Sequence, residues 1–372
     1  MSLLEKQRLH FRILEAGVTL RGPDEVVQPI AFAYRRFVSD DAGAGAIRLE
    51  LDSIDATVIR VDGRTVDLVP DLDVGLQFYQ VLLDALMDRI GSHALLHAAA
   101  LRTRSGDALL LAAPSGHGKT SLTLELAHRG LGFMGDDYAP FDLDRRRILP
   151  YPRAVGIHPE GDAPIPAAFR APATRPGVTR LFGKSLLDVG QVLGEDKVCT
   201  EPVPLQGVVL LTAGNHLAER APTRIVVAAR RRDSDELQSF FAETPGIEIL
   251  EHAEQPNLTL WSLRLDHAES PTLALSQILD SEKVLFSEKV WDERPDFLDR
   301  PAVNPVRRRE AAEYLGREML NRRSGGRLLA RHDGSVTTLF LRLAGALRDA
   351  SCWSVSVGGY RETADLIETL VC

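Results

Sequence analysis

The sequence predicts an α/β protein that is preceded by a small α+β module. A short apolar run at residues 108–113 leads through a loop of small residues into a helical pattern at 120–128. Other runs of strand length alternate with amphipathic segments along the rest of the chain. Residues 1–90 carry strand and helix signals of their own.

The composition is that of a soluble globular protein. The chain has 372 residues, 44% hydrophobic and 26% charged, which allows one large domain with a small appended one, or two domains. No apolar run approaches the ~18 residues that a membrane helix needs, and the N-terminus has no apolar signal core. The net charge of −8 argues against non-specific nucleic-acid binding. Widely spaced cysteines at 199, 352 and 372 indicate a reducing, cytoplasmic location without a metal cluster.

Residues 1–90 are predicted to form the α+β module. Its expected elements are a strand at 9–13, a hairpin of 58–61 and 65–69, and a helix at 73–90. Asp62-Gly63 is a strong signal for the tight turn of that hairpin. We expect this module to serve packing or substrate docking, because it holds no catalytic pattern.

Residues 94–101 and 108–113 are predicted to be neighbouring antiparallel strands, joined by a turn at Ser105-Gly106. His97 interrupts the first apolar run. A histidine satisfied inside the core is the ordinary explanation for such a residue.

The loop that follows has the spacing of a phosphate-binding loop. Gly116, Gly118, Lys119 and Thr120 match the usual pattern, although Ala113 stands where that pattern opens with Gly. Backbone N–H groups from Ser115 to Thr120 can converge on phosphate oxygens at the positive end of the helix. Lys119 can reach the β- and γ-phosphates and Thr120 can hold Mg²⁺. The candidate nucleotide-binding residues are Ser115, Gly116, His117, Gly118, Lys119, Thr120 and Ser121. A surface glycine loop with a solvated lysine is the alternative.

Asp136 and Asp137 follow the next predicted strand, one short helix after the loop. Two adjacent carboxylates at a strand end beside a phosphate loop suit Mg²⁺ binding and proton abstraction. Taken alone, the pair fits a turn with two solvated aspartates better.

Residues 138–157 are predicted to form another hairpin, in which Arg153 neutralises phosphate charge or is an ordinary solvated strand arginine. The proline-rich stretch 158–180 is expected to be neither helix nor central strand. It suits a lid, an acceptor-binding segment or a flexible linker.

The remaining chain continues as α/β without a recognisable motif. Strands are expected at 205–211, 225–229, 258–265 and 353–357, and helices at 234–242 and 305–323. The apolar residues Ala364, Ile367, Leu370 and Val371 predict a final helix. Arginine clusters at 230–232, 307–309 and 322–323 fit solvated faces. If the substrate is an acidic peptide, one of these clusters serves it.

Four groups of residues resemble HPr kinase/phosphorylase in order and spacing. They are His97-Ala98-Ala99-Ala100, Ser115 to Thr120, Gly135-Asp136-Asp137 and Pro152-Arg153. They are more similar still to the related kinases that phosphorylate a serine of a lasso-peptide precursor. The resemblance covers about residues 90–160 well and the flanks loosely.

The resemblance implies an HPr-kinase-like P-loop domain with a mixed sheet at 91–372, elaborated at about 213–330. It implies ATP and Mg²⁺ as cofactors and transfer of the γ-phosphoryl group to a serine hydroxyl of a peptide or small protein. Asp136 would take the hydroxyl proton with His97 orienting it, Arg153 and Lys119 would lie at the phosphates, and Thr120 and Asp137 would hold Mg²⁺. HPr kinase is a hexamer, so the resemblance is also compatible with a homo-oligomer.

Tyr151 stands where HPr kinase has a glutamate. The missing carboxylate puts a second metal ligand and the reverse phosphorylase activity in doubt. Two other functions stay open: a kinase for a small metabolite, and a nucleotide-binding regulator that transfers nothing. A regulator needs no base, so the aspartate pair with His97 argues against it.

Lys119→Ala is expected to abolish phosphoryl transfer and to weaken Mg-ATP binding, because the triphosphate loses its main cation. Isothermal titration calorimetry measures the affinity. Equal ATP affinity for the wild type and the variant would contradict the phosphate-loop prediction.

Overall fold

The computed structural model describes residues 7–69, 73–114, 116–159, 164–212, 224–254, 258–265, 278, 283–290, 300–322 and 326–371. The chain forms two compact units. The first comprises Met1–Val66, Asp73–Leu217 and Asp296–Cys372, and the second comprises Asp67–Leu72 and Ala218–Pro295. The predicted domain boundary after residue 90 lies within the first unit and stays a prediction.

The N-terminal part of the first unit is a five-stranded sheet of order β1-β2-β3-β4-β5 with two α-helices among its described residues. Its elements are β1 Gln7–Ile13, β2 Ala16–Gly22, α1 Asp24–Ala33, η1 Arg35–Phe37, β3 Ile47–Glu50, β4 Val58–Val61, β5 Arg64–Asp67 and α2 Val74–Arg89. The predicted hairpin and helix are confirmed. Asp62 (φ 50°) and Gly63 (φ 82°) both have positive φ, as the tight Asp-Gly turn requires.

The larger sheet of the first unit is mixed. Its order is β6-β10-β11-β15-β8-β7-β9, with β21 beside β15 and β20 beside β21. Its strands are β6 Ala94–Leu96, β7 Ala98–Arg102, β8 Ala108–Ala112, β9 Gly132–Gly135, β10 Ala139–Asp142, β11 Arg147–Ile148, β15 Val203–Thr212, β20 Ala302–Pro305 and β21 Ser351–Ser356. β15 runs parallel to β8 and β21, whereas β7 is antiparallel to β8 and β20 to β21. Thr212 and Ala302 lie on opposite sides of the same residue, Ser356.

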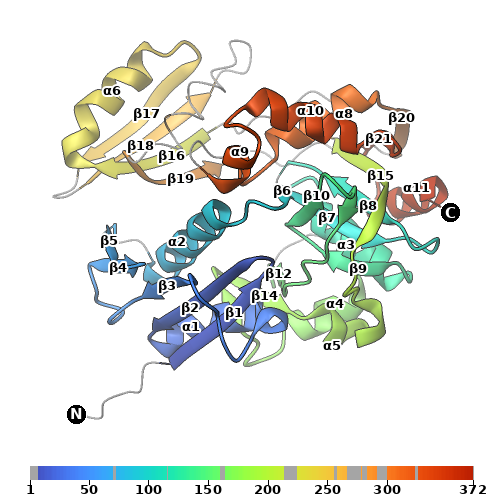
Figure 1. Cartoon of the computed structure of the whole chain (residues 1–372), viewed down its shortest axis with the longest axis horizontal. Helices are drawn as coiled ribbons and strands as arrows, with labels where there is room; N and C mark the ends of the chain where they lie inside the picture. The colour runs from blue at the N-terminus through green and yellow to red at the C-terminus, as the bar shows by residue number, and fades with distance from the viewer. Residues whose placement is uncertain are drawn as a thin grey trace. The chain divides into compact units, whose positions relative to one another are not determined.

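Helices cover both faces of this sheet (Figure 1). They are α3 Lys119–His128 and α11 Tyr360–Val371 on one face, and α8 Arg308–Arg317, α9 Arg327–Arg331 and α10 Val336–Ala346 on the other. Every residue of β8 is therefore buried: Leu109 and Leu111 pack toward α3, while Ala108 and Leu110 pack toward α8. A strand buried on both faces gives a rigid base for the loop that follows it.

A three-stranded sheet of order β12-β14-β13 and two short helices complete the described part of the first unit. Their bounds are β12 Val155–Ile157, α4 Ala167–Ala173, β13 Arg180–Leu181, β14 Lys184–Leu187, α5 Val189–Leu193 and η2 Glu195–Lys197. The second unit has a four-stranded sheet and α6 Ser234–Glu243 in its described ranges. Its other elements are β16 Arg224–Arg230, η3 Arg231–Asp233, β17 Ile247–Glu254, β18 Leu258–Leu265 and β19 Val284–Val290.

Four predictions of secondary structure were wrong, and the first is the helix at 305–323, since Pro305 lies in β20 and α8 spans only Arg308–Arg317. The strand at 94–101 is broken at His97 into β6 and β7. The proline-rich stretch contains α4, because Pro166 occupies the N-cap and Pro172 comes near the end of a seven-residue helix, where few backbone bonds are lost. The hairpin at 138–157 stops at β11, and β12 pairs with β14 instead, since Pro150 and Pro152 interrupt the ladder.

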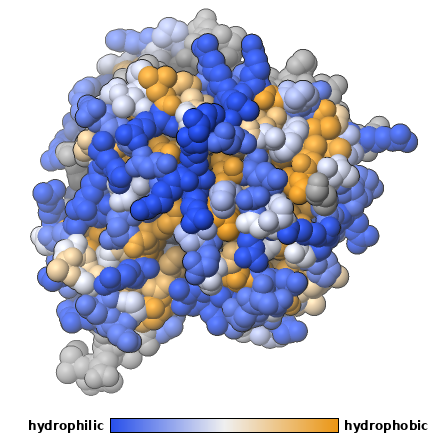
Figure 2. Space-filling view, turned by 45° about the vertical axis from the view of Figure 1, so that its right-hand side comes forward, coloured by the Kyte–Doolittle hydropathy of each residue, from blue (hydrophilic) through white to orange (hydrophobic). Residues whose placement is uncertain are grey.

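No helix of the described ranges is long and apolar enough to cross a membrane. The face drawn in Figure 2 is mainly hydrophilic, with smaller hydrophobic patches between the polar side chains. Two of the exposed large apolar side chains, Val336 and Leu341, belong to α10.

Asn321 fixes the segment after α8 to the segment before β6. Its buried side chain accepts a hydrogen bond from the Leu95 amide and donates to the carbonyls of Ile90 and His93, each at 2.9 Å. Asn321→Ala is expected to lower the free energy of unfolding by about 3 kcal/mol, because buried backbone groups lose their partner. Urea denaturation measures this. Asn304→Ala at an exposed position of β20 is the control, and an equal effect of both variants would contradict the argument.

Candidate functional site

The strand predicted before the loop and the helix predicted after it are confirmed. β8 ends at Ala112 and α3 begins at Lys119. Gly116 (φ 82°) and Gly118 (φ 80°) both adopt the left-handed conformation that favours glycine. The first turn of α3 leaves backbone N–H groups without intrahelical partners, as at any helix start. Predicted site residue Ser115 lies outside the described residues. His117 and Ser121 are buried at this turn.

Lys119 carries a buried ammonium group. Within the described chain, its Nζ atom has no hydrogen-bond partner, and neither has the Oδ1 atom of Asp136. Burial lowers the pKa of Lys119 below its ordinary value, while attraction to Asp137 and Asp136 opposes this shift. The solvated lysine that the sequence left open is therefore not what the structure contains. A buried ammonium with spare donors fits an anionic ligand such as phosphate.

Asp136 and Asp137 follow β9 directly, in a bend of the backbone. Thr120 donates its hydroxyl to Asp136 Oδ2 at 3.1 Å. Burial and repulsion from Asp137 raise the pKa of Asp136 above its ordinary value. A carboxylate with a raised pKa is a stronger base, which is the property that a proton acceptor needs.

Asp137 faces a different partner. Its Oδ2 atom accepts from Arg153 Nη2 at 2.5 Å, and its side chain is 35% exposed. Burial acts to raise the pKa of Asp137, but attraction to Arg153 and then Lys119 outweighs it and holds this pKa below its ordinary value. Burial and charge thus shift the pKa values of the two neighbouring carboxylates in opposite directions, upward for Asp136 and downward for Asp137.

Arg153 is not the solvated strand arginine of the alternative prediction, since its side chain is only 15% exposed. Its guanidinium lies over the Tyr138 ring, 4.9 Å from the centroid, and donates to the hydroxyl of Tyr79 on α2. The N-terminal part, for which the sequence indicated no chemistry, therefore supplies a direct contact to a predicted site residue. Tyr151 is buried against the Tyr138 ring, with 5.4 Å between centroids.

His97 lies between β6 and β7, where it bonds to Glu318. The His97 amide donates to the Glu318 carbonyl at 2.9 Å, and His97 Nδ1 is 3.1 Å from Glu318 Oε2. Attraction between His97 and Asp137 contributes to the lowered pKa of Asp137, so the histidine lies near the carboxylate pair.

Glu318 was missed by the sequence analysis, which assigned residues 305–323 to a charged helix without a role. It is the C-cap residue of α8, and its charge also acts to raise the pKa of Lys119. Glu318 reaches the site because Met319 forms a β-bridge with Leu96 and Leu320 donates to the Leu95 carbonyl. No local pattern around residue 318 indicates this pairing.

No family model matches the chain, and no curated protein matches it. The chain is similar to the solved structure of the Hpr(Ser) kinase/phosphatase from Coxiella burnetii, with 18% sequence identity and a TM-score of 0.22. The match covers 34% of this chain and 70% of that one.

Tyr79→Phe removes only a hydroxyl, which accepts from Arg153 and makes a longer hydrogen bond of 3.4 Å with the Tyr34 hydroxyl. We expect the free energy of unfolding to fall by about 1 kcal/mol, the usual net value of one such hydrogen bond. Mg-ATP binding should weaken as well, because Arg153 then fixes Asp137 less firmly. Urea denaturation and calorimetry measure the two effects. Tyr360→Phe, at a tyrosine of α11 with no contact to Arg153, is the control. Unchanged ATP affinity in Tyr79→Phe would refute the link to the site.

Proposed function

We propose that the protein is a phosphotransferase that uses Mg-ATP and transfers the γ-phosphoryl group to a hydroxyl. The observation that carries this proposal is the buried pair of Lys119 Nζ and Asp136 Oδ1. Both atoms lack a hydrogen-bond partner in the described chain, and both lie beside the loop between β8 and α3. Unpartnered buried charges are costly in a resting protein, so their presence supports a ligand that satisfies them.

Each group has a task in such a transfer. Lys119 and the amides at the start of α3 would hold the β- and γ-phosphates, and Thr120 with Asp137 would hold Mg²⁺. The bound cation would neutralise phosphate charge. Asp136 accepts the proton of the acceptor hydroxyl while the hydroxyl oxygen bonds to the γ-phosphorus. The bond between the γ-phosphorus and the bridging oxygen of the β-phosphate breaks, which releases ADP. Positioning and charge stabilisation supply most of the catalysis in this reaction class.

The acceptor that we propose is a serine of a peptide or small protein, namely the precursor of a ribosomal, lasso-like natural product. The support for this narrower proposal is the resemblance of His97, the loop, the aspartate pair and Arg153 to the kinases of that kind. Incubation with labelled ATP and candidate precursor peptides, followed by mass spectrometry, tests it. Phosphate on a serine is the expected result. Turnover of a free amino acid or sugar with no peptide labelling would replace this acceptor by a small metabolite.

Asp136→Asn is expected to lower turnover by roughly 10²–10⁴-fold at unchanged Mg-ATP affinity, because general-base help is lost. Asp137→Asn should instead raise the Mg²⁺ concentration needed for activity. Kinetics of both variants across a Mg²⁺ titration decide between the roles. Asp365→Asn, at an exposed aspartate of α11, is the control.

The contact of Thr120 with Asp136 makes the exchanged assignment the natural competitor, with Asp136 on Mg²⁺ and Asp137 beside the hydroxyl. If Asp136→Asn keeps full turnover at saturating Mg²⁺, Asp136 is not the base and the exchanged roles replace the proposed ones.

A further inference from the structure

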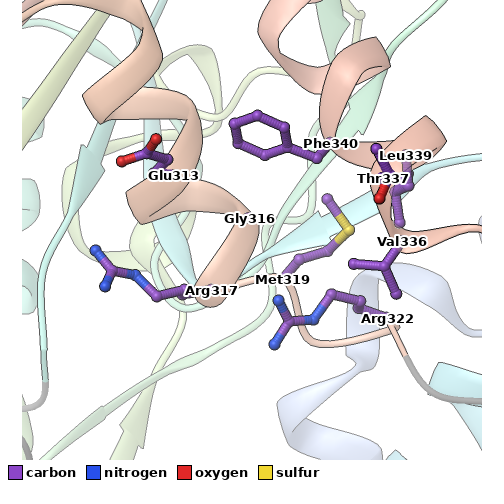
Figure 3. Close-up of a pocket in the computed structure, with 9 residues that line it drawn as sticks. All are labelled: Glu313, Gly316, Arg317, Met319, Arg322, Val336, Thr337, Leu339 and Phe340. Atoms are coloured by element: carbon purple, nitrogen blue, oxygen red, sulfur yellow. The ribbon is translucent and has the colours of Figure 1, made fainter. Parts of the chain in front are cut away.

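A cavity of about 420 Å³ lies between α8, the segment after it and α10. Its lining consists of Glu313, Gly316, Arg317, Met319, Arg322, Val336, Thr337, Leu339 and Phe340 (Figure 3). Most of these residues present apolar groups. The volume falls in the usual range of ligand-binding pockets and suits a few side chains.

We call this cavity the groove. It adjoins the candidate site through one β-bridge. Met319 in the groove is the bridge partner of Leu96, and His97 follows Leu96 in the chain. Glu318, which precedes Met319, is the residue that bonds to His97. The groove and His97 are therefore on the order of 10 Å apart. This distance is the sum of about one spacing between paired strands and one residue along the chain.

The charges at the groove are mainly positive. Figure 3 shows Arg317 and Arg322 along one side of the cavity and Phe340 on the other. Arg322 is partly buried, and it pairs with no carboxylate of the described ranges. The acidic residue of the lining, Glu313, pairs with Arg309 at 2.8 Å. An apolar cavity with an unpaired guanidinium at its edge is complementary to a segment that carries both an apolar and an acidic side chain.

The exposure of the groove supports a bound chain segment over a small molecule. Val336 at the start of α10 is 50% exposed although it lines the cavity. An extended peptide rises about 3.3 Å per residue, so a side chain roughly three residues from a serine near His97 reaches the groove.

We propose that this groove docks the acceptor peptide by an apolar and an acidic side chain close to the phosphorylated serine. The inference rests on the proposed peptide-kinase function and adds the class of sequence that the enzyme selects. Arg322 binds the acidic group, and Met319, Val336 and Phe340 surround the apolar one.

A positional-scanning library of peptides with a fixed central serine, incubated with labelled ATP and the full chain, tests this. We expect an apolar and an acidic preference within about three residues of the serine. Arg322→Glu should lower kcat/KM for acidic peptides about tenfold or more and shift the preference toward basic residues, because like charges then meet. Val336→Asp should remove the apolar preference. An aspartate in the first turn of a helix is well tolerated, so the variant folds.

Two matched controls keep the test specific. Arg348→Glu reverses an exposed arginine just beyond the far end of α10, and Leu341→Asp changes an exposed leucine of α10 that does not line the groove. Neither should alter the sequence preference. Mg-ATP affinity, measured by calorimetry, should be equal in all variants.

The outcomes separate the two proposals. Phosphorylated peptides without any sequence preference, or with a preference that Arg322→Glu leaves intact, overturn the groove and leave the kinase assignment standing. Failure to label any serine peptide, together with phosphorylation of a small metabolite, overturns the groove and the peptide acceptor and leaves phosphoryl transfer to a hydroxyl standing.

Discussion

Two buried cations and two carboxylates balance each other where β8, β9 and α3 meet, and the site depends on this balance. Arg153 contacts Asp137, Tyr79 and the Tyr138 ring, whereas Lys119 Nζ has no hydrogen-bond partner in the described chain. Removing one member of a buried charge pair costs several kcal/mol. One side of the cluster is thus fixed by the protein, and the other side is left for a ligand to complete. The same asymmetry separates the pKa values of Asp136 and Asp137.

Segments far apart in the chain maintain this arrangement. Tyr79 comes from α2, the lysine from α3, and Glu318 from the end of α8, where Asn321 holds the chain against the start of β6. Because each contact is made across long sequence separations, the site forms only when the sheet has its final register. A mutation at Asn321 therefore changes the geometry at His97 without touching any ligand.

Local sequence patterns were sufficient to predict the position of the loop between β8 and α3, the helix α3, the aspartate pair after β9 and most strands. Gly116, Gly118 and Lys119 predict their own backbone conformation, since positive φ and a helix start follow from residue type and spacing. Glu318 could not be found this way, because its partner His97 lies 221 residues earlier and only the bridge of Met319 with Leu96 brings them together. The helix α4 was missed because a local rule was applied too widely, whereas Glu318 was missed because no local rule applies to it. A sound rule about proline was applied to a whole stretch, although proline is acceptable at the first turn of a helix.

The two strand partners of Ser356 also indicate where the chain can accept an inserted domain. Thr212 and Ala302 each pair with Ser356, on opposite sides of β21, so their Cα atoms are about 10 Å apart at two strand spacings. Three or four residues of extended chain cover such a gap. Most of the second compact unit falls between these two positions. The chain can therefore gain, exchange or lose that unit as a module during evolution while β15, β20 and β21 keep their pairing, and the sequence of that unit can diverge at a different rate from the loop between β8 and α3.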